Sequence, residues 1–301
     1  MDRLEAMTLL LAAVEHGSLS KASRELHLPL ATISRKVAEL ESHLKATLLI
    51  RSTKGLELTP TGRAYVTAAK AILEQLSEVE RAASGEYTAP RGDLVVTAPI
   101  MLGRLHVLPV VTEFLSRFPE IAVSLTLADR IAHFPDDQID VAVRVGALSD
   151  GNLVANRLGE VRRVTCASPD YLASSGIPAT PGDLGLHNVI SFENVASPTT
   201  WTFGSGDSAA RVTFRSRLSV DTIDAAIDAG LAGAGLIRAM SYQVVELVRA
   251  GRMTVVLEGF EGPPLPVHLV YARHNRLPLK LRAFIDCAIP GLRERLARAA
   301  L

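Results

Sequence analysis

Residues 33–62 decide the fold of the N-terminal part, and they read ISRKVAELESHLKATLLIRSTKGLELTPTG. Apolar residues recur there at helical spacing, at Ile33, Val37, Leu40 and Leu44. This period predicts a helix that buries one stripe. Residues 48–59 then form two short extended runs about a Lys-Gly turn, which predicts a β-hairpin. A helix followed directly by such a hairpin is typical of a helix-turn-helix with a wing.

Two further helices are expected upstream of this stretch. The buried stripe of the first helix is predicted at Leu4, Met7, Leu11 and Val14. Ser18 or Ser20 suits the N-cap of a second helix, and Leu28-Pro29-Leu30 separates that helix from the third. Three short amphipathic helices also fit an ordinary helical bundle, so the periodicity alone leaves two interpretations open.

The polar residues favour the DNA-binding interpretation. Hydrogen-bond donors lie on the outer face of the third helix and at the tip of the hairpin, while the acidic Glu39 and Glu41 lie near the C-terminal end of that helix. We expect the helix to enter the major groove and the wing to hold phosphate or the minor groove. The candidate DNA contacts are Ser18, Ser20, Lys21, Leu30, Thr32, Ser34, Arg35, Lys36, Arg51, Thr53 and Lys54.

The net charge hides this pattern. The 301 residues hold 32 Lys and Arg against 32 Asp and Glu, which by itself argues against a nucleic-acid partner. The charge is unevenly distributed, however, because residues 18–63 carry +4 and the flanks 1–17 and 64–90 carry −2 each. We therefore expect few phosphate contacts per subunit and a shallow salt dependence of DNA binding.

A long helix is expected from Thr59-Pro60-Thr61-Gly62 onward, since proline is tolerated in a first turn. Its apolar seam runs through Tyr65, Ala69, Ile72, Leu76, Val79 and Ala83. Such a seam predicts pairing with a copy of the same helix, and packing against its own domain is the alternative.

After Gly92 the chain alternates short β-branched runs with helical stretches, which predicts an α/β domain with parallel βαβ units. The expected strands are 94–97, 122–127, 139–143, 164–166, 189–192, 211–214, 235–237 and 267–271, and the expected helices are 102–118, 222–231 and 278–287. The last strand should return to partners in the first half. Two lobes joined by two crossings would leave a cleft for a small ligand.

The predicted fold class is therefore α/β overall, with a mainly helical N-terminal part. We expect a DNA-binding domain over residues 1–59, a linker helix over 60–90 and an effector domain over 91–301. Within the effector domain, the first lobe should combine 91–161 with 267–301, and the second lobe should span 162–266.

Several classes of protein are disfavoured. No segment reaches the roughly 18 apolar residues of a spanning helix, and the acidic start is unlike a signal peptide, so a cytoplasmic protein without membrane contact is expected. Cys166 and Cys287 lack metal or disulfide spacing and are expected to be buried free thiols, with a redox sensor as the alternative. The sequence offers no metal site, no cofactor motif and no catalytic set, so we do not expect an enzyme.

Residues 17–26, 33–37, 40–51 and 58–62, in this order and spacing, resemble LysR-type transcriptional regulators. The resemblance implies a winged helix-turn-helix, a dimerising linker helix and a two-lobed effector domain like that of periplasmic binding proteins. It also implies a dimer or tetramer on a double-stranded DNA operator, and RNA polymerase is a further candidate partner. The chain departs from the family pattern at Pro29-Leu30-Ala31, where Ser-Gln-Pro is common, so the base-reading rule is not transferable.

Candidate effector contacts lie at the ends of the expected strands. Thr97-Ala98-Pro99-Ile100 joins a strand to a helix, where free N–H groups suit a carboxylate, although a plain helix cap is the alternative. Arg144 suits a bidentate anion or a neighbouring aspartate. The resemblance adds Leu127, Ala128, Asp129, Val145, Gly146, Phe203 and Thr222. Trp201 is expected in the lobe core rather than at the ligand.

These observations predict a transcriptional regulator that is controlled by a small organic effector, for which an anion is one candidate. Two alternatives stay open. One is a regulator that has no effector and uses its lobes for assembly. The other is a cytoplasmic solute-binding α/β protein whose N-terminal helices serve only assembly.

Overall fold

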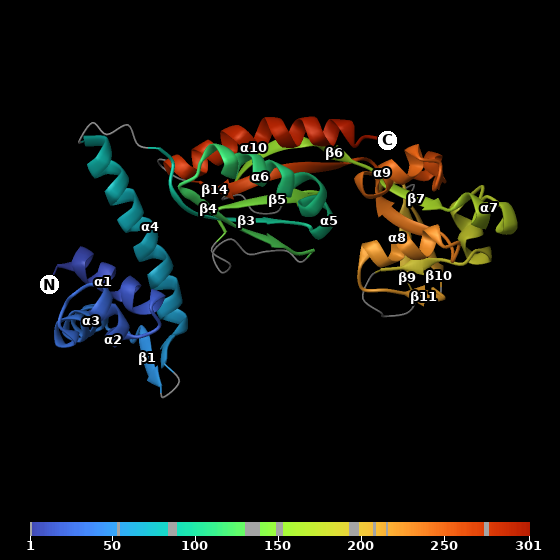
Figure 1. The fold of residues 1–301 in the computed structure, drawn as a ribbon. Helices are drawn as coiled ribbons and strands as arrows, with labels where there is room; N and C mark the ends of the chain where they lie inside the picture. The colour runs from blue at the N-terminus through green and yellow to red at the C-terminus, as the bar shows by residue number, and fades with distance from the viewer. Residues whose placement is uncertain are drawn as a thin grey trace. The chain divides into compact units, whose positions relative to one another are not determined.

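A computed structural model describes residues 2–52, 55–83, 89–129, 139–148, 153–192, 199–206, 209–214, 216–273 and 277–301. The chain divides into two compact units, Met1–Ala89 and Pro90–Leu301 (Figure 1). Among the described residues, no helix is both long and apolar enough to cross a membrane.

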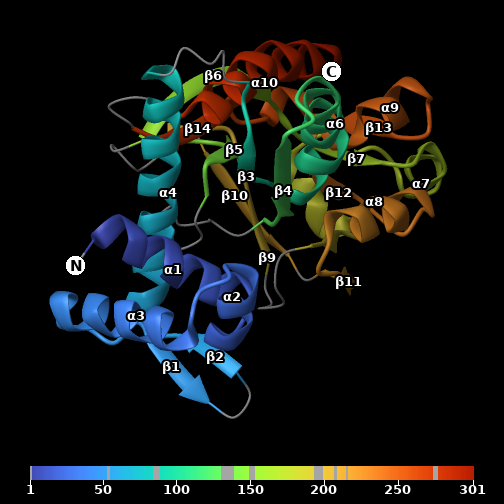
Figure 2. The same cartoon turned by 60° about the vertical axis from the view of Figure 1, so that its left-hand side comes forward.

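The first unit is a winged helix-turn-helix followed by one long helix. Its elements are α1 (Arg3–Glu15), α2 (Leu19–Glu25), α3 (Leu30–Leu44), β1 (Leu49–Ser52), β2 (Gly55–Leu58) and α4 (Pro60–Ala83). Figure 2 shows α1, α2 and α3 gathered around one end of α4, with the β1–β2 hairpin projecting beside them. The predicted stripe of α3 is confirmed, because Ile33, Val37 and Leu40 are buried in the core of this unit.

The predicted stripe of α1 is wrong. The buried residues of α1 are Ala6, Leu9, Leu10 and Ala13, whereas Leu4 is exposed. Apolar side chains lie on nearly every side of this helix, so its period does not single out one face. The packing of α1 against α3 and α4 decides which face is buried.

The Thr-Pro-Thr-Gly stretch joins the wing to α4. Thr59 Oγ1 accepts a hydrogen bond from Gly62 N at 2.8 Å and donates to the carbonyl oxygen of Thr47 at 2.8 Å. A Cβ on Gly62 would stand 2.1 Å from the carbonyl oxygen of Leu48, so only glycine fits. Glu41 completes the junction, since its Oε1 accepts from Leu48 N at 2.7 Å and from Leu49 N at 3.0 Å.

The first lobe of the second unit is built on a five-stranded sheet of order β4-β3-β5-β14-β6. Its strands are β3 (Gly92–Ala98), β4 (Ile121–Leu127), β5 (Val141–Val145), β6 (Leu153–Val161) and β14 (Leu265–Ala272). Strand β3 runs parallel to β4 and β5, whereas β14 runs antiparallel to β5 and β6. Figure 1 shows α6 (Leu108–Arg117) and α10 (Leu279–Arg298) covering one face of this sheet.

The second lobe holds a three-stranded antiparallel sheet and two small pairs of strands. The sheet has the order β12-β7-β13, from β7 (Arg163–Ala167), β12 (Ile237–Met240) and β13 (Thr254–Val256). Strands β8 (Ile190–Ser191) and β11 (Leu218–Ser219) pair with each other, as do β9 (Thr199–Phe203) and β10 (Ala210–Phe214). The helices are α7 (Pro169–Ser175), η2 (Pro181–Leu186), α8 (Ile223–Leu231), α9 (Ser241–Arg249) and η4 (Glu258–Phe260).

Several expected elements differ in detail. The helix predicted over 102–118 is divided into α5 (Ile100–Leu102), the π-helix η1 (Gly103–Val107) and α6, because Pro109 cannot donate to an i−4 carbonyl and a wider turn precedes it. The helix predicted to end at Cys287 continues through Pro290 to Arg298, held by buried Leu292 and Leu296. The expectation of parallel units applies to β3, β4 and β5 but not to the second-lobe sheet.

Candidate functional site

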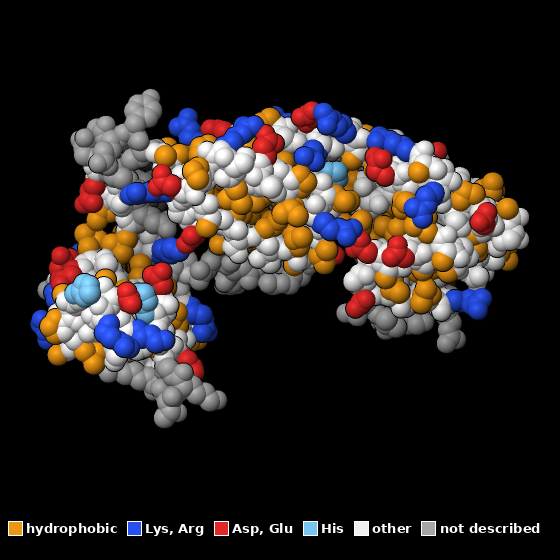
Figure 3. Space-filling model, viewed as in Figure 1, with side chains coloured by type: hydrophobic (Ala, Val, Ile, Leu, Met, Phe, Trp, Pro, Cys, Tyr) orange, Lys and Arg blue, Asp and Glu red, His pale blue; other side chains and the backbone are white. Residues whose placement is uncertain are grey.

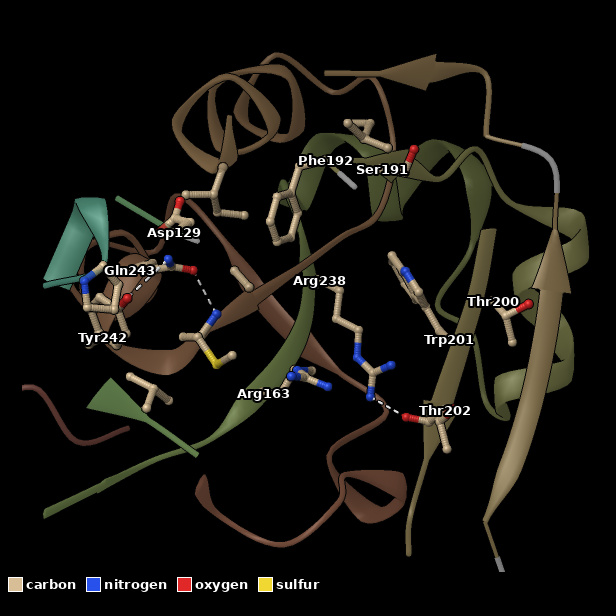
Figure 4. Close-up of a pocket in the computed structure, with 16 residues that line it drawn as sticks. Asp129, Arg163, Ser191, Phe192, Thr200, Trp201, Thr202, Arg238, Tyr242 and Gln243 are labelled. Atoms are coloured by element: carbon tan, nitrogen blue, oxygen red, sulfur yellow. Dashed lines mark hydrogen bonds between the residues drawn. The ribbon is translucent and has the colours of Figure 1, made fainter. Parts of the chain in front are cut away.

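A cavity of about 310 Å³ in the second unit is lined from both lobes (Figure 4). The first lobe contributes Pro99, Asp129 and Val145. The second lobe contributes Ile190, Ser191, Phe192, Thr200, Trp201, Thr202, Ile223, Arg163, Arg238, Ala239, Met240, Tyr242 and Gln243. We call this cavity the effector pocket. Its volume lies at the lower end of the range for small-molecule sites.

The register of two strands brings two arginines to one side of the effector pocket. Arg163 on β7 pairs with Met240 on β12, and Arg238 on β12 pairs with Thr165 on β7. Directly paired residues of antiparallel strands share a face, and so do residues two apart along one strand. Arg163 and Arg238 are therefore diagonal neighbours on the same face, and Figure 4 shows both among the lining side chains.

Arg238 is held rigidly. Its residue is only 9% exposed, its Nη2 donates to the carbonyl oxygen of Thr202 at 2.6 Å, and its Cζ lies 4.5 Å from the ring centroid of Phe203 and 5.6 Å from that of Trp201. Cation–π contacts of this kind are strongest where water is excluded. The Arg238 guanidinium is thus a fixed positive charge in the pocket wall.

Arg163 supplies a second, more accessible cation. Its side chain is exposed at the pocket, and within the described part of the chain it has no hydrogen-bond or ion-pair partner. Two guanidinium groups on one face repel each other, and an anion between them would relieve that repulsion. Trp201 and Phe192 provide apolar wall beside these charges.

Tyr242 and Gln243 form the polar wall at the start of α9. Gln243 Oε1 accepts from Met240 N at 2.8 Å, and its Nε2 donates to Tyr242 Oη at 3.3 Å. Burial raises the pKa of Tyr242 well above its usual range, so the phenol stays protonated. This wall offers neutral hydrogen-bonding groups to a ligand.

The N-terminus of α5 was the predicted carboxylate site, and a carboxylate of the chain itself lies there. Asp129 Oδ1 accepts a hydrogen bond from Ile100 N at 3.0 Å. Asp129 also lines the effector pocket, so the first-lobe wall carries a negative charge while the second-lobe wall carries two positive ones.

Three of the predicted effector residues, Pro99, Asp129 and Val145, line the effector pocket. Thr97, Ala98 and Phe203 are buried, and Phe203 lies beneath Arg238. Thr222 caps α8 through Ala225 N at 3.3 Å, and Arg144 Nη1 donates to its neighbour's carbonyl oxygen. The remaining predicted residues lie outside the lining, namely Ile100, Leu127, Ala128 and Gly146.

Arg163 and Arg238 carry the positive charge of the effector pocket, and neither was predicted from the sequence. An arginine inside a short apolar strand, as in Ile237-Arg238-Ala239, was the available signal. Trp201 was expected in the lobe core, and it is buried there against Phe203 and Phe214 while also lining the pocket.

The predicted DNA-binding residues divide into exposed and structural ones. Arg35 is exposed on α3 and pairs with Glu39 at 2.9 Å, while Leu30, Ser20 and Lys21 are also exposed. Thr32 and Ser34 are half-buried. Ser18 caps α2 by accepting from Ser20 N at 3.2 Å, as predicted, whereas Pro29 gives α3 no side-chain cap.

Lys36 lies against a neighbouring helix. Its Nζ forms an ion pair with Glu5 of α1, and its side chain is largely covered. This contact fastens α3 to α1 and turns Lys36 away from the exposed face that carries Arg35. The side chain of Arg51, and all of Thr53 and Lys54, lie outside the described residues.

A winged helix-turn-helix joined to a two-lobed α/β unit with a polar pocket defines a class of ligand-responsive, DNA-binding regulators. Residues 4–63 match the model of the bacterial regulatory helix-turn-helix proteins of the lysR family, and residues 88–293 match that of the LysR substrate binding domain. The chain belongs to the LysR family, whose members are transcriptional regulators and not enzymes.

The similarity to known relatives extends over nearly the whole chain. An HTH-type transcriptional repressor of Pseudomonas aeruginosa (strain UCBPP-PA14) is 34% identical, covering 95% of this chain and 91% of the relative. The uncharacterized HTH-type transcriptional regulator YhjC of Escherichia coli (strain K12) is 33% identical, covering 98% and 100%. Among solved structures, CrgA from Neisseria meningitidis is 27% identical with a TM-score of 0.60, covering 96% and 98%.

Proposed function

We propose that this LysR-type regulator is controlled by a small organic anion bound in the effector pocket. The observation that carries the proposal is the placement of Arg163 and Arg238 on one face of the β7–β12 pair, beside Trp201. An anion between the guanidinium groups would gain charge-assisted hydrogen bonds from Arg163. Trp201 and Phe192 favour an apolar or aromatic body on the ligand.

The opposite wall restricts the ligand further. Asp129 repels a second anion, so the end of the ligand that faces the first lobe should be neutral or a hydrogen-bond donor. A regulator without an effector would fit a cleft filled with side chains. A cavity of about 310 Å³ that is lined by three charged residues favours the ligand-controlled alternative.

Trp201 fluorescence tests this proposal, since Trp201 is the only tryptophan of the chain. A panel of aliphatic and aromatic monocarboxylates, together with their amides, should yield a saturable change for some carboxylates and none for the matching amides. Arg163→Gln should weaken that binding at least tenfold, in line with the roughly 1.5–3 kcal/mol of a charged hydrogen bond. Arg252→Gln, which removes the same charge from the exposed surface of the second lobe, should leave it unchanged. Equal binding of acids and amides would refute the anion assignment.

We further propose that α3 reads the major groove through its exposed face, with Arg35 as the principal base contact and Leu30 as an apolar contact. The pairing of Lys36 with Glu5 supports a structural role for Lys36 instead. Arg35→Ala should lower specific operator affinity by roughly tenfold or more. Lys36→Ala should destabilise the first unit while leaving the base preference of the folded protein unchanged. Equal loss of base preference in both variants would contradict this assignment.

Oligomerisation through α4 is part of the proposal. Ile72 and Val79 on the predicted seam are 45% and 53% exposed, an arrangement that suits pairing with a second α4. We infer that the protein acts in the cytoplasm as a dimer or tetramer on its operator, and that ligand binding alters the angle between the lobes and hence the bend of the DNA. An unchanged footprint and bend with a bound carboxylate would refute this control.

A further inference from the structure

A second cavity of about 510 Å³ is lined by both lobes of the second unit. The first lobe contributes Leu105 and His106 from η1 and the C-terminal part of α10, and the second lobe contributes one face of α9. Its lining residues are Leu105, His106, Tyr242, Val245, Glu246, Arg249, Arg295, Arg298 and Ala299. We call this cavity the α9–α10 pocket.

The α9–α10 pocket is basic. Three arginines line it against one glutamate, and Figure 3 shows Lys and Arg side chains gathered where the end of α10 meets α9. Arg249 is occupied, since it pairs with Glu246 at 3.0 Å and donates to the carbonyl oxygens of Arg298 at 2.8 Å and Ala300 at 3.1 Å. These bonds fix the end of α10 against α9.

Arg298 and Arg295 differ from each other in their partners. Arg298 forms an ion pair with Glu294 one turn earlier on α10. Arg295 is half-buried, and within the described part of the chain its guanidinium has no hydrogen-bond or ion-pair partner. A half-buried guanidinium has lost part of its hydration, and an anion would replace it with charge-assisted hydrogen bonds.

His106 adds a buried donor at the same place. It is 9% exposed, and its Nε2 is buried with no hydrogen-bond partner among the described residues. The π-turn of η1 places the ring edge-on to Tyr242, with 5.7 Å between ring centroids. Burial and then the positive charge of Arg295 lower the pKa of His106, so the ring is neutral at physiological pH. A neutral imidazole can donate one hydrogen bond from Nε2.

We propose that the α9–α10 pocket is a second ligand site, which holds a small oxyanion between Arg295 and the imidazole of His106. The phosphate or carboxylate group of the ligand would give Arg295 its counter-charge and the His106 N–H an acceptor. Leu105, Val245 and Ala299 form the apolar part of the lining, which suits a compact ligand rather than a macromolecule. The site is separate from Arg163 and Arg238 and does not depend on the function proposed for them.

Tyr242 connects the two pockets, because it lines both of them. A ligand in the α9–α10 pocket contacts the first lobe through η1 and α10 and the second lobe through α9. It would therefore favour one relative position of the lobes, and that position also shapes the effector pocket.

The test follows the ring signals of His106 by nuclear magnetic resonance in the full chain labelled at its histidines. The chain holds eight histidines, and His106→Gln identifies the signal by removing it. Inorganic phosphate and succinate are titrated separately, with chloride at matched ionic strength as the reference. We expect saturable movement of the His106 signal by at least one of the two oxyanions, with little movement by chloride.

Two variants of α10 make the assignment specific. Arg295→Gln should weaken the oxyanion affinity at least tenfold, while Arg282→Gln, at the other end of the same helix, should leave it unchanged. Arg295→Lys keeps the charge and should give an intermediate affinity, and it replaces Arg295→Gln if that variant does not fold. Movement with phosphate alone identifies a phosphate ligand, and movement with succinate alone identifies a carboxylate ligand. The proposal is overturned if neither oxyanion exceeds chloride, or if Arg295→Gln and Arg282→Gln respond alike.

Discussion

Arg162 ties together the two places where the chain passes between the lobes, and its loss should be measurable. It occupies the single position between β6 and β7. Its Nε donates to Glu261 at 2.9 Å and its Nη2 to both Glu261, at 3.2 Å, and Glu258, at 2.9 Å. Both glutamates precede β14, the strand that returns to the first lobe. Although burial opposes it, hydrogen bonds to the two glutamates raise the pKa of Arg162, so this guanidinium stays charged at any physiological pH.

The two carboxylates provide an internal comparison. The side chain of Glu261 is 11% exposed and that of Glu258 is 63% exposed, while that of Arg162 is 31% exposed. Removing one partner of a fully buried pair costs about 3–5 kcal/mol. Because Arg162 is partly hydrated, we expect Arg162→Met to cost about 2–3 kcal/mol. Glu258→Gln should cost under about 1 kcal/mol, as is usual for a surface pair.

Double-mutant cycles measured by urea unfolding separate these contributions. Trp201 fluorescence reports the unfolding of the second unit, and the m-value should stay constant across the variants. The coupling energy between Arg162 and Glu261 should reach about 2 kcal/mol, against less than about 0.5 kcal/mol for Arg162 and Glu258. Equal coupling for the two glutamates, or none for Glu261, would refute the claim that burial decides the strength of this tie.

Three further predictions concern packing, ionisation and assembly. Gly62→Ala places a Cβ 2.1 Å from the Leu48 carbonyl oxygen. The clash should cost about 3 kcal/mol, which outweighs the gain of about 1 kcal/mol in helix propensity. Amide hydrogen exchange in the first unit should therefore become faster. Burial raises the pKa of the Cys166 thiol to about 12. The contribution of this thiol to the stability of the folded protein is full below about pH 9, and it is lost as the pH rises further because the unfolded thiol ionises first. The free energy of unfolding should therefore fall by about 1.4 kcal/mol per pH unit above pH 9 relative to Cys166→Ala, and parallel pH profiles would contradict this. Ile72→Glu with Val79→Glu should lower the mass measured by sedimentation, and an unchanged mass would exclude the α4 seam as an interface.

The winged helix-turn-helix could be predicted because local rules specify it. The stripe through Ile33, Val37 and Leu40, the Lys-Gly turn and the Thr-Pro-Thr-Gly start of α4 each act over a few residues. The inward face of α1 could not be predicted in this way. Leucines and alanines lie on most sides of α1, so the choice of Ala6 and Leu10 over Leu4 depends on α3 and α4.

The effector pocket could not be predicted from local sequence patterns. Arg163 and Arg238 are 75 positions apart, and only the antiparallel register of β7 with β12 makes them neighbours on one face. A shift of the register by one residue would send Arg238 to the opposite side, among the apolar side chains of Val164 and Cys166. The signal in the sequence was therefore an arginine within an apolar strand. Burying that charge costs free energy, so such an arginine indicates a position where the charge has a function.

At the start of α5, where a ligand carboxylate was expected, the chain itself supplies a carboxylate. Free N–H groups at a helix N-terminus attract an anion of either origin, and the sequence cannot say whether the chain or a ligand supplies it. Here Asp129 supplies it, since β3 and β4 run parallel in a register that brings residue 129 beside the start of α5. With that position filled by a fixed negative charge, a ligand carboxylate gains nothing near Ile100. The positive charge of the pocket lies on β7 and β12, so the anion that we propose would be recognised by the second lobe.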